Sequence, residues 1–350
     1  MQPGDENRVL VIGAQGVLGG LLVEDLSQHG WEVIPAGRRP NGDPAFRHVD
    51  LDEPESLAAA LRDIELVVNA VPEPALTAER MVLSRGGVLI NVSALPAAAG
   101  QRLRRQATAA RGTVIMNAGV APGVTNLIAA ALLAEHPEAD EVELVFTLSV
   151  GASTGRAGRE FAHRGLTGVP DHRTARIALP EPYGPRRCLG FAELDAGWLG
   201  SLAGDRVVSP YLCIAEAPVH AALLAINRTR LMSKLPRSAL VSSSGPRADK
   251  PPGRERIAHW VGVRKDRRLL AARTLQCRGD YRAAAAATSV FARAVHDDAK
   301  TSSPRPGVFD PQEVLSLDRL SDALGLAGMT VVQQPVRGEP AVAASSERQR

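Results

Sequence analysis

The fold of this chain is decided by the stretch Val9-Leu10-Val11-Ile12-Gly13-Ala14-Gln15-Gly16-Val17-Leu18-Gly19. An apolar run followed by spaced glycines predicts a buried strand, a tight turn and the start of a helix. Gly13 permits the turn, Gly16 lets the backbone approach a pyrophosphate at the helix N-terminus, and Gly19 permits close helix–strand packing. We therefore expect a dinucleotide site that also involves Gln15, Val17 and Leu18. A tight turn that binds no ligand is the alternative.

The same strand–helix rhythm continues to about residue 118. Apolar runs predict strands at 9–13, 31–36, 46–49, 66–70, 88–92 and 113–116. Amphipathic segments predict helices at 16–29, 54–61 and 74–84. Strands that alternate with helices in this way are typical of a doubly wound parallel sheet, the Rossmann type of α/β fold.

The pattern changes after Pro122, where a helix is predicted to run to about residue 135. Alternating apolar and polar residues predict strands at 141–150, 173–179, 206–214, 256–264 and 269–277. Helices are predicted at 217–233, 281–295 and 311–324. These elements indicate a second, α+β domain with a mixed or antiparallel sheet.

The predicted domain limits are 1–122 for the cofactor domain and 123–334 for a substrate and dimerisation domain. The helix at 311–324 is expected to be able to pack back on the first domain. Residues 242–253 are rich in Ser, Gly and Pro and predict a loop. Residues 335–350 show no periodicity, and we expect them to be disordered.

The end of the second predicted strand indicates which cofactor binds. NAD sites usually place Asp or Glu there, to accept from the ribose 2′-hydroxyl. This strand instead exits through Gly37-Arg38-Arg39. Two guanidinium groups suit a 2′-phosphate, so we expect NADP(H). Two solvated arginines are the alternative, and Asp50 could bind the adenine amino group or cap the next helix.

Composition excludes several classes of partner. The formal net charge of the 350 residues is +3, too small to indicate nucleic-acid binding. No apolar run is long enough for a membrane span, and the beginning of the sequence shows no signal-peptide pattern. Cys188, Cys213 and Cys277 fit neither a metal site nor a disulfide framework. We therefore expect a cytoplasmic enzyme with reduced thiols and no bound metal.

A family resemblance rests on the glycine turn, on Arg38-Arg39 and on Asn117-Ala118-Gly119-Val120-Ala121-Pro122-Gly123-Val124-Thr125-Asn126-Leu127. With these motifs the chain resembles the saccharopine dehydrogenase-like family of NAD(P)-dependent oxidoreductases. Segments 48–52, 67–72, 279–281 and 306–313 are also similar to that family. The match covers most of the chain and is strongest over 8–130.

The resemblance implies a site at the ends of the later strands. It implies that the turn with Gly119, Pro122, Gly123 and Thr125 lies against the nicotinamide. It also implies that Asn69, Ala70, Val71, Pro72 and Ser93 line the cofactor path. Open α/β sheets bind ligands at this edge, which agrees with the implied position. A proline-started helix with a glycine hinge is the other interpretation of the turn.

The family also implies the chemistry and the assembly. Its members reduce imines formed between amines and carbonyl compounds, or oxidise the corresponding secondary amines. We therefore expect a small imine, amine or keto acid as substrate. The resemblance further implies that the second domain closes over the nicotinamide and that the protein is a homodimer.

Candidates for an acid near the substrate lie in the second domain. The cofactor supplies the hydride, so the protein needs to orient the substrate and keep the imine protonated. His163, His172 and Tyr183 are candidates, with Asp171 as a partner, in a Gly- and Arg-rich stretch interpreted as a loop reaching the cleft. Surface positions are the alternative for each of them. Arg156, Arg159, Arg164 and Arg173 are candidates for binding a substrate carboxylate.

The same residues bear on other functions. Short-chain dehydrogenases pair a catalytic Tyr with a Lys one helical turn later, but the corresponding positions here are Arg187, Ala215 and Ala285. This excludes that mechanism. A nucleophilic Cys188 in a loop is a weaker alternative. A C=O or C=C reductase, and an NADPH-binding redox sensor without turnover, stay open.

Overall fold

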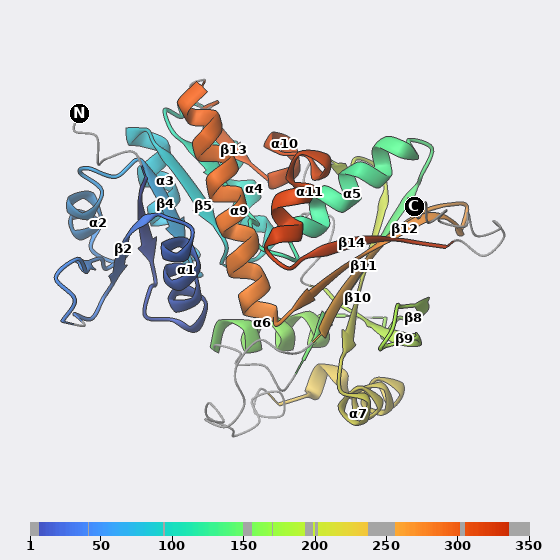
Figure 1. Cartoon of the computed structure of the whole chain (residues 1–350). Helices are drawn as coiled ribbons and strands as arrows, with labels where there is room; N and C mark the ends of the chain where they lie inside the picture. Colours follow the sequence, from blue (N-terminus) through green and yellow to red (C-terminus); the bar gives the residue numbers. More distant parts are fainter. Residues whose placement is uncertain are drawn as a thin grey trace, which may run out of the picture.

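The computed structural model describes residues 7–40, 42–93, 95–149, 156–169, 171–192, 199, 202–236, 256–301 and 305–335. Two seven-stranded sheets lie side by side, one parallel and one mixed, with helices packed around and between them (Figure 1). This confirms the predicted fold class, a Rossmann-type sheet followed by an α+β part. The predicted tail at 335–350, apart from residue 335, and the predicted loop at 242–253 lie outside the described residues.

The first sheet is parallel throughout and has the strand order β13-β6-β5-β4-β1-β2-β3. Its strands are β1 (Arg8–Ile12), β2 (Glu32–Gly37), β3 (Arg47–His48), β4 (Leu66–Asn69), β5 (Val88–Asn91), β6 (Thr113–Ile115) and β13 (Gly307–Phe309). The first six were predicted from apolar runs. The seventh comes from the far end of the chain and pairs with β6, with Gly307 opposite Thr113.

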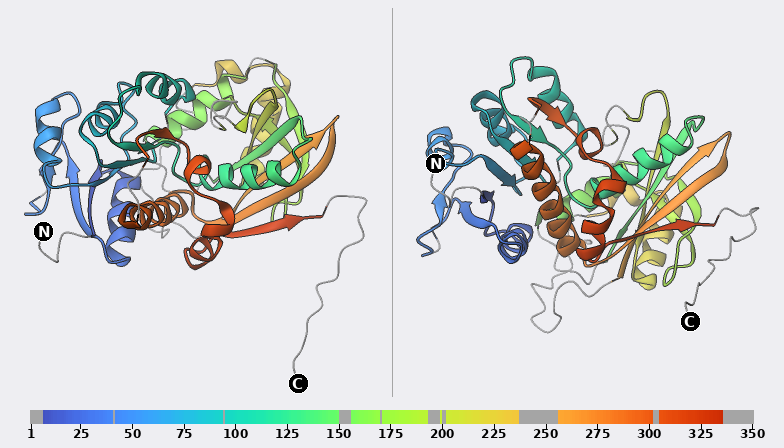
Figure 2. Two further views of the ribbon diagram at one scale, coloured as in Figure 1. Left: turned by 90° about the horizontal axis from the view of Figure 1, so that it is seen from above. Right: turned by 45° about the horizontal axis from the view of Figure 1, so that its top comes forward.

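Helices cover both faces of this sheet. On one face α2 (Pro54–Ala60), α3 (Thr77–Arg85) and α4 (Ala97–Gln106) share a hydrophobic cluster with alternate residues of the strands. On the other face lie α1 (Val17–Gln28) and the long α9 (Asp280–Thr301) (Figure 2). The buried Ala283, Ala285 and Ala287 of α9 have small side chains, which allows the elements around this helix to approach it closely.

The second sheet has the strand order β14-β12-β11-β7-β10-β9-β8. The strands are β7 (Glu141–Leu148), β8 (Thr174–Ala178), β9 (Pro185–Gly190), β10 (Val207–Ile214), β11 (Arg256–Lys265), β12 (Arg268–Arg278) and β14 (Thr330–Gln334). Strands β7 and β10 are parallel, and the other neighbours are antiparallel. Its helices are α5 (Val124–Glu135), α6 (Arg156–Thr167), α7 (Ala217–Arg228), the 3₁₀ turn η3 (Met232–Lys234), α10 (Pro311–Val314) and α11 (Leu317–Leu326).

One hydrophobic core joins the two sheets. The same cluster contains Val9 and Val11 of β1, Leu127 of α5, and Val142 and Val261 of the second sheet. Helix α5 leaves the first sheet and packs against β11 and β12 of the second. Continuous apolar packing therefore holds the two sheets next to each other where α5 crosses from the first to the second.

Several elements differ from the prediction. Residues 156–167, interpreted as part of a loop, form α6, because Phe161 and Leu166 bury one face of it. Cys188 lies in β9 and is fully buried, so its assignment to a loop was wrong. Cys213 and Cys277 are buried in strands, as predicted. Within the described residues, no helix has the length and apolar character needed to cross a membrane.

The packing of α9 leads to a stability prediction. Ala287 is completely buried, so Ala287→Leu must push α9 away from its neighbours. We expect the free energy of unfolding to fall by roughly 1–3 kcal/mol. Asp297→Leu, at an exposed position of the same helix, should change it by less than about 0.5 kcal/mol. Urea denaturation measures both, and equal values for the two variants would contradict the close packing.

Candidate active site

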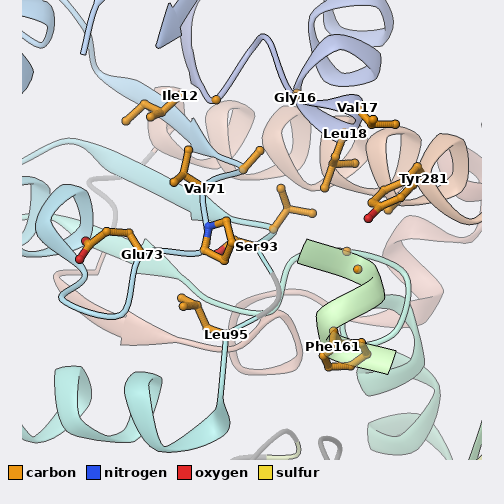
Figure 3. Close-up of a pocket in the computed structure, with 18 of the residues that line it drawn as sticks. Ile12, Gly16, Val17, Leu18, Val71, Glu73, Ser93, Leu95, Phe161 and Tyr281 are labelled. Atoms are coloured by element: carbon orange, nitrogen blue, oxygen red, sulfur yellow. The ribbon is translucent and has the colours of Figure 1, made fainter. Parts of the chain in front are cut away.

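A cavity of about 930 Å³ lies between the carboxyl ends of the first sheet's strands and the second sheet. In Figure 3 the labelled side chains reach it from α1, from the loops after β4 and β5, and from α6 and α9. Fifteen of the predicted cofactor residues line it: Gly13, Gln15, Gly16, Val17, Leu18, Gly19, Arg38, Arg39, Asp50, Ala70, Val71, Pro72, Ser93, Gly119 and Pro122. Asn69, Gly123 and Thr125 lie behind this lining and are buried.

The glycine turn presents the N-terminus of α1 to the cavity. Gly16 is the N-cap of α1, and the first turn of this helix holds no acidic residue. A Cβ on Gly19 would lie 2.0 Å from the carbonyl oxygen of Gly13, so only glycine permits this packing. The free N–H groups of a helix start, together with its dipole, favour an anion. The turn therefore fits a pyrophosphate.

The arginine pair lies at one end of the cavity. Arg38 and Arg39 are exposed, and neither guanidinium has an ion pair or hydrogen bond with the part of the chain that the structure describes. Gln15 Nε2 donates to the Arg39 carbonyl oxygen at 2.7 Å and so ties this loop to the glycine turn. Two unpaired cations beside a dinucleotide cavity fit a ribose phosphate. Asp50 also lines the cavity and is not the N-cap of α2, which is Glu53.

A buried carboxyl group holds the ends of β4 and β5. Glu79 Oε1 accepts from Asn69 Nδ2 at 2.8 Å and from Asn91 Nδ2 at 2.6 Å. The carbonyl oxygens of these amides accept from the backbone N–H of Val71 at 2.9 Å and of Ser93 at 2.8 Å. Burial raises the pKa of Glu79. The network positions two loops that line the cavity, and no sequence motif predicted a role for Glu79 or Asn91.

The turn after β6 is also built by close backbone contact. Gly123 has a φ of +134°, and a Cβ there would lie 1.9 Å from the Gly119 carbonyl oxygen. Gly119 N–H donates to the Pro122 carbonyl oxygen at 3.1 Å. From α9, Thr288 Oγ1 donates to the Ala118 carbonyl oxygen at 2.8 Å. The turn is thus held both by its own backbone contacts and by α9.

Asn117, next to this turn, lines the cavity and is held by the C-terminal segment. Its Nδ2 donates to Asp310 Oδ1 at 2.8 Å, and Arg104 forms an ion pair with Asp310 Oδ2 at 2.9 Å. Burial raises the pKa of Asp310 to about 6, although Asn117 and Arg104 act to lower it. Asp310 follows β13, so the added strand of the first sheet also supports the site.

The second sheet, α6 and α9 supply the opposite wall of the cavity. The lining residues are Phe146 and Leu148 of β7, Gly158 and Phe161 of α6, His259 of β11, and Asp280, Tyr281 and Ala284 of α9. None of them carries a local sequence pattern that predicts a place in the site. A lone His within a strand pattern carries no signal that separates a core residue from a cavity residue.

The predicted catalytic residues lie elsewhere, and none of them lines this cavity. His163 Nε2 donates to the Leu235 carbonyl oxygen at 2.8 Å. His172 has a left-handed backbone, and its carbonyl oxygen accepts from Asn227 Nδ2 at 2.8 Å. The Tyr183 hydroxyl donates to the Arg256 carbonyl oxygen, and burial raises the pKa of Tyr183. Asp171 is exposed.

The other candidates from the sequence are not in the cavity either. Arg159, Arg164 and Arg173 do not line it, and the side chain of Arg156 lies outside the described residues. The thiol of Cys188 is sealed in the core, where the hydrogen bond with Cys213 and then burial raise its pKa, which argues against a nucleophile. No cluster of three or more His, Cys, Asp or Glu that could hold a metal occurs within the described ranges.

Comparison with known proteins supports the fold. Residues 9–99 match the family model described as the NAD dependent epimerase/dehydratase family. No curated protein matches the sequence. Apo saccharopine dehydrogenase (L-Glu forming) from Saccharomyces cerevisiae is similar over 94% of this chain and 100% of its own, with a TM-score of 0.55 and 13% identity. A meso-DAPDH mutant from Clostridium tetani is similar over 88% of this chain and 94% of its own, with a TM-score of 0.47 and 10% identity.

The chain therefore has the fold of saccharopine dehydrogenase over nearly its whole length. This confirms, at the level of the fold, the resemblance indicated by the sequence motifs.

The buried Glu79 network yields a second prediction. Glu79→Ala leaves the amides of Asn69 and Asn91 without their acceptor, so we expect unfolding free energy to fall by roughly 2–4 kcal/mol. Glu79→Gln keeps an acceptor oxygen and should lose less than about 1.5 kcal/mol. Chemical denaturation is the measurement, with exposed Glu55→Ala as the control. If Glu79→Ala were no less stable than Glu55→Ala, the network would not support the strand ends.

Proposed function

We propose that this protein is an NADP(H)-dependent oxidoreductase that reduces a small imine to a secondary amine. The observation that carries the proposal is the single cavity that joins three features. It begins at two unpaired guanidinium groups, passes the N-terminus of α1, and ends between the Gly119–Pro122 turn and the second sheet. Its length and polarity suit a phosphorylated dinucleotide with room for a substrate beyond it.

The choice of the phosphorylated cofactor rests on Arg38 and Arg39. They follow β2, at the position where an acidic residue would accept from an unmodified ribose. The exposed guanidiniums can form charge-assisted bonds with a 2′-phosphate. When bound, the nicotinamide supplies the hydride.

The reaction of a C=N bond fits the polar groups that α9 contributes to the cavity. Asp280, at the first position of α9, lines the cavity together with Tyr281, and its Oδ2 accepts from the backbone N–H of Ser149 at 3.4 Å. A protonated imine already carries its proton, so the carbon accepts the hydride while the C=N electron pair moves to nitrogen. The protein then needs a negative charge beside the cation rather than an acid that delivers a proton. We assign this role to the carboxylate of Asp280.

Two alternatives follow from the same scaffold. One is a C=O or C=C reductase, which would need a proton for the product. The other is a redox sensor that binds NADPH without turnover. The homodimer and the cytoplasmic location stay predictions from the sequence.

The cofactor preference is tested by Arg38→Asp. Loss of the cation and gain of a carboxylate should weaken NADPH binding by roughly 10- to 100-fold and improve NADH binding, reversing the preference. Arg62→Asp makes the same charge change at an exposed position that does not line the cavity, so it should leave the preference unchanged. Dissociation constants from fluorescence titration measure the effect. A wild-type preference for NADH would refute the choice of cofactor.

The reaction is tested by following cofactor absorbance with NADPH and a panel of cyclic imines, ketones and keto acids. We expect oxidation of NADPH with at least one imine, and Asp280→Asn should lower kcat more than it raises the KM for NADPH. Turnover of ketones or keto acids alone would favour the carbonyl reductase. Tight NADPH binding with no consumption across the panel would favour the sensor.

A further inference from the structure

The wall of the cavity formed by the second domain is aromatic. Side chains alternate along a strand, so His259 lies on the same sheet face as Ile257 and Val261, which belong to the core shared with the first sheet. Phe146 of β7 is stacked on the His259 ring, with centroids 5.2 Å apart and planes 12° apart. Phe161 of α6 meets Phe146 edge to face at 6.0 Å. We call Phe146, Leu148, Phe161 and His259 the aromatic wall.

The neighbours of His259 determine which of its two ring nitrogens carries the hydrogen. Nδ1 accepts a hydrogen bond from the backbone N–H of Thr147 at 3.2 Å, so this nitrogen carries no hydrogen. The neutral ring must then carry its hydrogen on Nε2. Burial lowers the pKa of His259 to about 3, which keeps the ring neutral near pH 7.

No hydrogen bond joins the Nε2–H of His259 to the described part of the chain. Nε2 is not among the buried side-chain atoms that lack a partner, so this atom stays accessible from the cavity that His259 lines, although the residue as a whole is only 2% exposed. The aromatic wall therefore presents one hydrogen-bond donor to a molecule bound in the cavity.

The charges of the lining narrow the substrate class. Among the described lining residues, Arg38 and Arg39 are the only Lys or Arg, and both lie at the opposite end. Among the described lining residues from the second sheet, α6 and α9, the one charged side chain at neutral pH is the Asp280 carboxylate, which would repel a substrate carboxylate. This wall therefore favours an apolar cation over an amino dicarboxylate.

We infer that the aromatic wall is a subsite for an aromatic ring that carries a neutral oxygen acceptor, and that His259 Nε2–H donates to this oxygen. The inference rests on the proposed function, because it names the substrate class of the same cavity. The ring packs against Phe161 and Leu148, and the imine cation faces Asp280.

Two substitutions separate the donor from a structural role. His259→Asn keeps a side-chain oxygen that can accept from Thr147 N–H but loses the donor at Nε2. His259→Gln places an amide N–H near the position of Nε2 and is less suited to accept from Thr147. A merely structural histidine would tolerate Asn better than Gln, whereas a donor to substrate would tolerate Gln better than Asn. The two roles thus predict opposite orders.

The probes are dihydroisoquinoline, its dimethoxy derivative and the non-aromatic piperideine carboxylate, each with NADPH. We expect the dimethoxy compound to have a KM roughly 2- to 10-fold below that of the unsubstituted one. His259→Asn should abolish this difference, and His259→Gln should keep part of it. Calorimetry with dimethoxy-tetrahydroisoquinoline and the NADP+-saturated protein gives the same comparison without turnover.

The outcomes separate the two proposals. Equal KM values for the two aromatic imines, preference for the piperideine carboxylate, or better function of His259→Asn than of His259→Gln would each overturn the inference and leave imine reduction standing. Binding of the product amine with the expected order of variants, but no oxidation of NADPH by any imine, would support the subsite and refute the proposed reaction. The absence of both turnover and binding for every aromatic probe would overturn the inference.

Discussion

The site depends on direct contact between backbone segments that no side chain separates. At Gly19 the helix start approaches the carbonyl of Gly13, and at Gly123 the turn after β6 approaches the carbonyl of Gly119. In both places a Cβ would lie within 2.0 Å of a carbonyl oxygen, far inside van der Waals contact, so any other residue must move the chain. These contacts aim the N-terminus of α1 and the last turn of the first sheet at one cavity.

Buried polar groups hold the remaining walls. Glu79 bonds to the amides that end β4 and β5, and Asp310 bonds to Asn117 beside the turn after β6. Each carboxyl is buried enough that its pKa is raised, which shows that desolvation outweighs its hydrogen bonds and nearby charges. Burying such a carboxyl costs free energy. Its removal would cost more, because the buried amide that donates to it would lose its acceptor, so the carboxyl fixes the position of the amide. The loops that line the cavity are therefore positioned by residues that do not line it.

Local patterns predicted most of the elements, and tertiary contacts explain the exceptions. The first six strands of the parallel sheet are short apolar runs between helices, a signal that needs no partner to be recognised. Strand β13 has only three residues and joins the sheet by pairing with β6, so its sequence carries too little periodicity. Helix α6 lies in a Gly- and Arg-rich segment and depends on Phe161 and Leu166 finding apolar neighbours.

The sequence by itself determined the parallel sheet, its glycine turn, and the arginine pair after β2, because each depends on residues close together in the chain. Only the tertiary structure decided which second-domain residues face the cofactor cavity. His163, His172 and Tyr183 suit the chemistry by residue type but do not line the cavity, whereas His259 and Asp280 do. Strand pairing and the packing of α9 bring these two residues together from separate elements, and residue type alone carries no information about such long-range contacts.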